Sequence, residues 1–396
     1  MSIFPSQRHL FDIPNEIAYF NCAYNSPQLN ESQNRLHAGV RAKSHPWERT
    51  PASFFEDAET IRRLSSETFG GDCRGYAVIP SASYGLSSAA RAIEPQLGPG
   101  DKILVIAEEF PSNVLPWKRT ARETGAALLT VATPEHGGWT KAILDKIDKD
   151  VKVVAVSPCH WTNGAFIDLA AVGIACRSVG GILVIDATQT LGAMPLSFAE
   201  VRPDFLVAAG YKWLLCPYGF SLLYVAEQWR DARPLEETWL ARENAEDFTS
   251  LVKYSESYLP GACRFDVGEK CTATILPGAI AALEQIKEWG VARIAESLTI
   301  INKAIGARLE QLGFLLPSES GRCPHMFGAQ LPDGYKGNLV SELKARQIYI
   351  SQRGKSVRFA PHLHINVHDV DRLLKAIDEI INADKGGKFS LGRLPC

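Results

Sequence analysis

The stretch AAGYKWLLCPYGFSLLYV, residues 208–225, places Lys212 between two apolar runs that are typical of buried strands. Lysine is rarely fully buried unless another group pairs with it. Lys212 is therefore either a surface residue at a strand end or a lysine that is kept in a pocket for chemistry. Upstream, VIDATQTLGAMPL (184–196) places Asp186 directly after another apolar run. An Asp at this place either caps the next turn or holds a positive charge.

The composition of the 396-residue chain is that of a globular protein, with 46% hydrophobic and 22% charged residues. This length favours two domains. The net charge of −2 gives no reason to expect a nucleic acid or an anionic membrane as partner. Neither a secretory signal nor an apolar run long enough to span a bilayer is visible. Nine cysteines without a C-x-x-C pair favour a reducing, cytoplasmic location.

Strand and helix patterns alternate between about residues 55 and 225. Apolar, β-branched runs such as KILVI (102–106) and VKVVAV (151–156) alternate with amphipathic stretches such as LAAVGIACRSVG (169–180). This alternation predicts an α/β fold with a mostly parallel sheet that is covered by helices on both faces. The expected divisions are residues 1–30, an N-terminal arm that contributes to the small domain or the active site; residues 31–275, the large domain; and residues 276–396, a linking helix and a C-terminal α+β domain.

Ligands of such sheets bind outside the carboxyl ends of the strands, so the residues after each strand are of most interest. The serine-rich turn with Ser83 is either a helix cap or an anion-binding site, and Phe110 is either a core residue or an aromatic wall. Gln189 follows Asp186 closely enough to face the same space. A lysine, a carboxylate, an aromatic face and an anion site together are the parts that pyridoxal 5′-phosphate (PLP) needs.

With these motifs, the chain resembles the fold type I PLP enzymes of the class V aminotransferase branch, which includes cysteine desulfurases, kynureninases and isopenicillin-N-epimerase-like proteins. The resemblance extends from AYFNCAYNSP (18–27) to VRFAPHLHINVHDVDRLL (357–374). It implies that Lys212 is the Schiff-base lysine and that Asp186 pairs with the pyridinium nitrogen. The other cofactor-binding residues that it implies are Ala82, Ser83, Phe110, Trp161, Gln189 and Tyr211. Those that it implies for the substrate are Asn25, Arg353 and Arg358.

The chain also departs from the pattern of the desulfurases. The tetrad that ends at Lys212 has Tyr211 where desulfurases have histidine, which is more similar to kynureninases. Trp161 replaces an asparagine that contacts the cofactor, which suggests a wall of the substrate pocket. Glu269 lies where a threonine of the neighbouring subunit reaches the phosphate, so that contact is lost or replaced by a backbone N–H. The resemblance also implies a homodimer.

The resemblance implies an enzyme that acts on an amino acid through an external aldimine and deprotonation at Cα. Family frequency favours an aminotransferase. The alternatives are a kynureninase-like enzyme, a C–S lyase or an epimerase, and a non-catalytic protein is disfavoured by the presence of Lys212 together with Asp186, Gln189 and Arg358. Arginine suits a substrate carboxylate because its planar fork makes two parallel bonds.

Two negative predictions complete the interpretation. The approach to Arg358, ARQIYISQRGKSVRF (345–359), contains no cysteine, although desulfurases carry their nucleophilic cysteine shortly before this arginine. With only Cys323 and Cys396 nearby in sequence, we expect no protein-persulfide mechanism. Arg353 occupies the loop instead, where it either contacts a second anionic group or is a solvated turn residue. The histidines in PHLHINVH (361–368) are expected to hold no metal.

Overall fold

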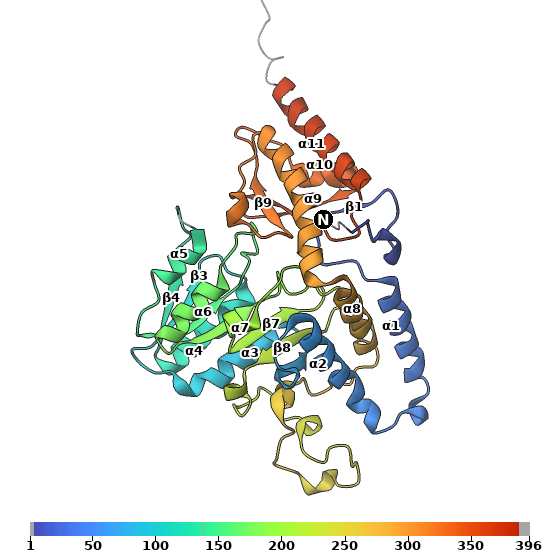
Figure 1. The fold of residues 1–396 in the computed structure, drawn as a ribbon, viewed down its shortest axis with the longest axis vertical. Helices are drawn as coiled ribbons and strands as arrows, with labels where there is room; N and C mark the ends of the chain where they lie inside the picture. Colours follow the sequence, from blue (N-terminus) through green and yellow to red (C-terminus); the bar gives the residue numbers. More distant parts are fainter. Residues whose placement is uncertain (1–3, 137, 388–396) are drawn as a thin grey trace, which may run out of the picture. The chain divides into compact units, whose positions relative to one another are not determined.

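The computed structural model describes residues 4–136 and 138–387, which form two units (Figure 1). The larger unit comprises residues 28–160 and 166–291. The smaller unit comprises residues 4–27, 161–165 and 292–387. Residues 276–291 lie in the larger unit, and the segment 161–165 lies in the smaller one.

The centre of the larger unit is a seven-stranded sheet with the strand order β2-β8-β7-β6-β5-β3-β4. Only β8 runs antiparallel to its two neighbours, so the prediction of a mostly parallel α/β sheet is confirmed. In chain order the strands are β2 (Tyr76–Ile79), β3 (Lys102–Ile106), β4 (Ala127–Val131), β5 (Val151–Val156), β6 (Ile182–Asp186), β7 (Phe205–Ala209) and β8 (Ser221–Val225).

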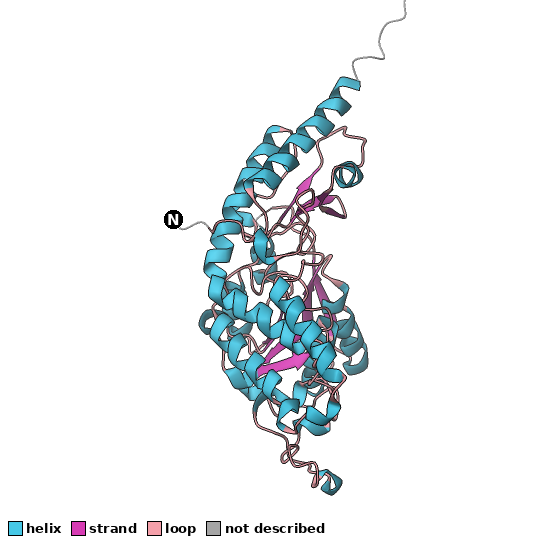
Figure 2. Cartoon of the chain, turned by 90° about the vertical axis from the view of Figure 1, so that its right-hand side faces the viewer, coloured by secondary structure: helices cyan, strands magenta, loops and turns pink. Residues whose placement is uncertain are grey.

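Helices cover both sides of this sheet (Figure 2). They are α1 (Asn30–Lys43), α2 (Glu56–Phe69), α3 (Ala82–Ile93), α4 (Leu115–Thr124), α5 (Gly138–Leu144), α6 (Leu169–Ser178), α7 (Phe198–Val201) and α8 (Leu276–Trp289). Side chains alternate across a strand, and Val184 and Val207 pack in one core with Leu86 of α3 and Trp117 of α4. Local signals set the helix ends: the Asp168 carboxylate, for example, accepts from two backbone N–H groups at the start of α6.

The smaller unit contains two short sheets and three helices. Its elements are β1 (Ala18–Tyr19), α9 (Val291–Gln311), β9 (Phe327–Gln330), α10 (Leu339–Ala345), β10 (Ile348–Tyr349), β11 (Ser351–Arg353), β12 (Ser356–Phe359) and α11 (Val367–Gly387). Strand β1 pairs in parallel with β10, and an antiparallel sheet has the order β11-β12-β9. Stacked Phe327 and Phe359 lie in its separate hydrophobic core. Within the described part of the chain, no helix has the length and apolar character that crossing a membrane requires.

Candidate active site

Lys212 lies just beyond the carboxyl end of β7 and is buried, with 6% of the residue exposed. Its Nζ atom lies 5.4 Å from the ring centroid of Phe110 and 5.6 Å from that of Tyr211. The preceding Gly210 allows the chain to turn here, because a Cβ atom at this position would lie 2.5 Å from the carbonyl oxygen of Phe220. The lysine is therefore enclosed beside aromatic rings, as a pocket lysine would be.

Asp186 ends β6, the strand next to β7, and is 5% exposed. Burial raises the pKa of its carboxyl group, while hydrogen bonds from Thr188 and the positive charge of Lys212 oppose the rise. The backbone N–H of Thr188 donates to Asp186 Oδ1 at 3.0 Å, and the Thr188 hydroxyl oxygen accepts from the N–H of Ala209 at 3.1 Å. Thr188 thus joins the turn after β6 to the end of β7 and holds the acid near the lysine.

Gln189 lies in the same turn, and the structure gives it a partner that the sequence did not suggest. The indole N–H of Trp213, which directly follows Lys212, donates to Gln189 Oε1 at 3.0 Å. Both side chains are buried. The bond fixes the orientation of the glutamine amide, whose oxygen accepts from the indole and whose NH₂ group is a donor.

The predicted anion site is the first turn of α3, after β2. Ser81 caps this helix by accepting from the N–H of Tyr84 at 3.1 Å. Ala82 is the first helical residue, and the exposed Ser83 hydroxyl lies 2.8 Å from the hydroxyl of Ser112. Free N–H groups and hydroxyls at a helix N-terminus suit a phosphate. Ser112 was missed in the sequence because it follows a different strand.

Phe110 and Tyr211 have different surroundings at this edge. Phe110 is 36% exposed, so one part of its ring is accessible. The ring centroids of Tyr211 and the largely exposed Tyr218 lie 4.5 Å apart. The edge therefore combines a buried lysine and acid with an accessible aromatic ring and a helix N-terminus. These residues fit PLP. Lys212 suits its aldehyde, Asp186 its ring nitrogen, Phe110 its ring face and the N-terminus of α3 its phosphate.

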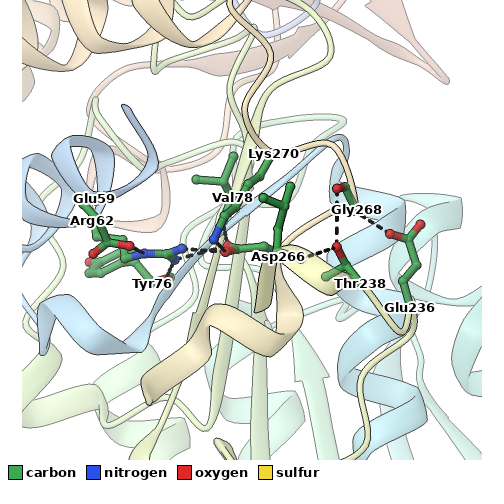
Figure 3. A network of polar contacts seen from close by, with 10 residues as sticks. Glu59, Arg62, Tyr76, Val78, Glu236, Thr238, Asp266, Gly268 and Lys270 are labelled. Atoms are coloured by element: carbon green, nitrogen blue, oxygen red, sulfur yellow. Dashed lines mark hydrogen bonds and ion pairs between the residues drawn. The ribbon is translucent and has the colours of Figure 1, made fainter. Parts of the chain in front are cut away.

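An ion network fixes the segment that contains Glu269 (Figure 3). The buried carboxylate of Asp266 binds Arg62 at 2.5 Å and Lys270 at 2.8 Å, and also accepts from the N–H of Val78 in β2 at 2.8 Å. These two cations hold the pKa of Asp266 below its usual value against the effect of burial. Glu269 itself is exposed. The network covers the free edge of β2, the strand that leads to the anion site.

The expected substrate residues lie in the smaller unit. The hairpin register pairs Ser351 with Arg358 and Arg353 with Ser356, so the two arginines lie on one face of β11 and β12. Arg358 is 1% exposed and donates to the carbonyl oxygen of Trp161 at 2.7 Å. The Arg353 guanidinium carbon lies 6.0 Å from the ring centroid of Trp161.

The predicted N-terminal substrate residue, Asn25, is held by its backbone. The Tyr19 hydroxyl donates to the carbonyl oxygen of Asn25 at 2.5 Å. The preceding Tyr24 is exposed, and its ring centroid lies 6.0 Å from the guanidinium carbon of Arg353. Arg353 thus lies near the rings of Tyr24 and Trp161, and Asn25 directly follows Tyr24.

Comparisons with known proteins identify the family of the chain. Residues 50–376 match the family model described as aminotransferase class-V. The chain is 23% identical over 396 residues to a "Probable cysteine desulfurase" of Pyrococcus abyssi, and the match covers 94% of this chain and 96% of that protein. An apo cysteine desulfurase of Thermococcus onnurineus NA1 has a similar structure, with a TM-score of 0.81 at 20% identity, covering 97% of this chain and 100% of that one.

The C–S lyase C-DES is a further structural match. Its form with glycine covalently linked to PLP has a TM-score of 0.83 at 18% identity, covering 95% of this chain and 99% of that one. Its complex, as a cystine C–S lyase, with the product cysteine persulfide has a TM-score of 0.80 at 18% identity and covers 93% and 98% of the two chains. The structures establish the fold, and the family model confirms the resemblance. The chain belongs to the class V aminotransferase family and is a fold type I, PLP-dependent enzyme.

Proposed function

We propose that this enzyme is a C–S lyase that acts on a sulfur-containing α-amino acid with a second carboxylate, for which cystine is the model substrate. The sequence alone favoured an aminotransferase and kept a lyase as an alternative. The relatives support the alternative better, since those described above are named cysteine desulfurases or a cystine C–S lyase. The homodimer implied by the resemblance stays a prediction.

The pair of arginines on the β11–β12 hairpin carries this proposal. Arg353 and Arg358 lie on one face of the hairpin, and both contact Trp161. Each arginine suits one carboxylate, because its guanidinium group can make two parallel, charge-assisted hydrogen bonds. Cystine has two α-carboxylates, whereas cysteine has one. We infer that Arg358 binds the α-carboxylate at the reacting end and Arg353 the distal one.

The reaction breaks the Cβ–S bond of the substrate. Cystine and water give pyruvate, ammonia and cysteine persulfide, and the bonding pair of the Cβ–S bond leaves with sulfur. When bound, PLP supplies an electron sink for the negative charge that develops at Cα. Lys212 Nζ removes the Cα proton, and the Asp186 carboxylate holds a proton at the ring nitrogen. Lys212 is buried and enclosed next to aromatic rings.

A desulfurase mechanism requires a thiolate of the protein that accepts sulfur. Cys323, the nearest preceding cysteine, is 2% exposed, and the hairpin with Arg353 carries none. Cys396 lies outside the described residues. Burial of a thiol disfavours the reactive thiolate. We therefore propose that the sulfur leaves on a small molecule and not on the protein.

The test compares cystine with cysteine as substrates of the PLP-loaded enzyme. We expect pyruvate and a small-molecule persulfide from cystine without an added keto acid, and much slower release of pyruvate from cysteine. Thiol alkylation followed by peptide mass mapping should find no persulfide on the protein. Amino transfer to an added keto acid as the faster reaction, or a persulfide on a protein cysteine that turns over at the catalytic rate, would contradict the proposal.

A further inference from the structure

Glu109 is a second buried carboxyl group at the carboxyl edge of the larger sheet, and neither the family resemblance nor the proposed reaction uses it. It follows β3 and is 7% exposed. The preceding Glu108 has a left-handed backbone with φ of 55° and is exposed. This turn directs two neighbouring glutamates into different surroundings, Glu108 toward solvent and Glu109 into the protein.

Hydrogen bonds hold the Glu109 carboxyl group from three sides. One oxygen accepts from the N–H of Phe110 at 2.8 Å, and the other accepts from the Ser157 hydroxyl at 2.9 Å and from the Asn113 amide at 3.5 Å. The indole N–H of Trp117 donates to the Asn113 oxygen at 3.5 Å, which orients the amide with its NH₂ group toward Glu109. Phe110 and Asn113 can only donate here, whereas a serine hydroxyl donates or accepts. The site can therefore hold either protonation state.

Burial and a nearby charge raise the pKa of Glu109, whereas the hydrogen-bond donors lower it. Burial, and next the negative charge of Asp186 on β6, raise the pKa of Glu109 to about 7. Burial raises the pKa of the Asp186 carboxyl as well, and the positive charge of Lys212, beyond β7, opposes that rise. Beyond β5, burial lowers the pKa of His160, which disfavours a positive charge on this imidazole. The protonation of Glu109 thus depends on how far the charge of Asp186 is compensated.

We propose that Glu109 is a positioning residue of the cofactor site: it holds a proton in the cofactor-free protein and releases that proton to solvent when the positive ring nitrogen of PLP pairs with Asp186. The ionised carboxylate is a stronger acceptor for the N–H of Phe110. Proton release therefore fixes the residue whose ring lies next to Lys212. This role concerns cofactor binding and holds for any substrate.

The test measures the PLP dissociation constant of the cofactor-free enzyme between about pH 5.5 and 8.5. Because PLP binding lowers the proton affinity of Glu109, wild-type affinity should rise with pH through the range in which Glu109 ionises. The gain is about ten-fold for each unit by which its pKa falls. Glu109→Gln should lack this part of the pH dependence. Glu108→Gln, which removes the same charge from the exposed neighbour, should retain it. Equal pH dependence in all three proteins would overturn the proposal.

A second measurement keeps the test valid if Glu109→Gln does not fold. Difference infrared spectra of the wild-type protein at about pH 6.5 should lose the carbonyl stretch of a protonated, buried carboxyl group when PLP is added. A stretch that persists after the cofactor has bound would show that Glu109 does not release its proton, or that no protonated carboxyl is coupled to the cofactor. Either result excludes the proposed role.

Discussion

The Nζ atom of Lys212 lies 5.4 Å from the ring centroid of Phe110, and these two residues follow β7 and β3, which are three positions apart in the order of the sheet. More than one hundred residues of sequence separate them. The sheet brings them together because the carboxyl ends of its parallel strands lie at one edge. Asp186 lies at the same edge. The roles assigned to Lys212 and Asp186 can therefore each be tested by substitution.

Attachment of the cofactor is the first prediction. Borohydride treatment of the PLP-loaded enzyme should fix the cofactor on Lys212, because this amine is enclosed at the edge where the other cofactor-binding residues gather. Peptide mapping by mass spectrometry locates the label. Lys212→Ala should prevent labelling, and Lys118→Ala, on exposed surface of α4, should not. A label on another lysine would contradict the assignment.

Protonation of the ring nitrogen is the second prediction. Asp186→Asn should still bind PLP, but a neutral amide cannot hold the ring proton by charge. If the pKa of the ring nitrogen falls by about two units, which corresponds to about 2.7 kcal/mol, kcat should fall roughly a hundred-fold or more. Absorbance reports the bound cofactor and steady-state kinetics report kcat. Activity within a few-fold of wild type would exclude this role for Asp186.

The two arginines should have separable effects on specificity. A charge-assisted hydrogen bond contributes about 1.5–3 kcal/mol, so Arg358→Ala should raise KM for cystine and for cysteine by roughly ten- to a hundred-fold. Arg353→Ala should raise KM by a similar factor for cystine alone. Lys355→Ala, in the exposed turn of the same hairpin, is the matched control and should change neither value. An equal effect of Arg353→Ala on both substrates would show that it does not bind a distal carboxylate.

Two buried histidines of the smaller unit should make the free energy of unfolding fall at acid pH. Burial lowers the pKa of His362 to about 3 and that of His364 to about 4. Between these values and the unfolded value of about 6.5, the unfolded chain binds more protons than the native one. Stability is therefore lost as pH falls from about 6.5, with a slope of up to about 1.4 kcal/mol per pH unit for each histidine.

Urea unfolding at several pH values measures this slope. His362→Gln should reduce it, even if the variant is less stable at neutral pH, because the titrating group is gone. His368→Gln, at an exposed position on α11, is the control and should leave the slope unchanged. The same slope in His362→Gln as in the wild type would remove this histidine from the explanation.

Arg62 binds two carboxylates, and we expect their removal to lower the free energy of unfolding by different amounts: strongly for buried Asp266 and weakly for exposed Glu59. Asp266→Asn leaves the charges of Arg62 and Lys270 buried without their counter-charge, which typically costs about 3–5 kcal/mol. Glu59 also binds Arg62, at 2.9 Å, but its side chain is 60% exposed. Glu59→Gln should therefore cost no more than about 1 kcal/mol. Urea unfolding measures the free energy of unfolding of both variants. Similar losses of stability would show that burial does not determine how much each carboxylate contributes to its ion pair with Arg62.

The sequence by itself determined the class of fold and the candidates at the strand ends. Short apolar runs predicted the strands, and polar residues directly after them, such as Asp186 and Lys212, predicted which side chains meet at the edge. The end of a strand can be read from the local sequence, and the parallel arrangement then places the residues after each strand at one edge of the sheet.

Only the tertiary structure decided the surroundings of individual side chains. The sequence presents Glu108 and Glu109 as equals, and a left-handed backbone angle makes one exposed and the other buried. The sequence presents Lys270 as a surface lysine, whereas in the structure it is buried and pairs with Asp266. Trp161 follows a strand of the larger unit but belongs to the smaller one. The burial that decides these surroundings, which shifts proton affinities and pairs charges, arises only when distant parts of the chain pack together.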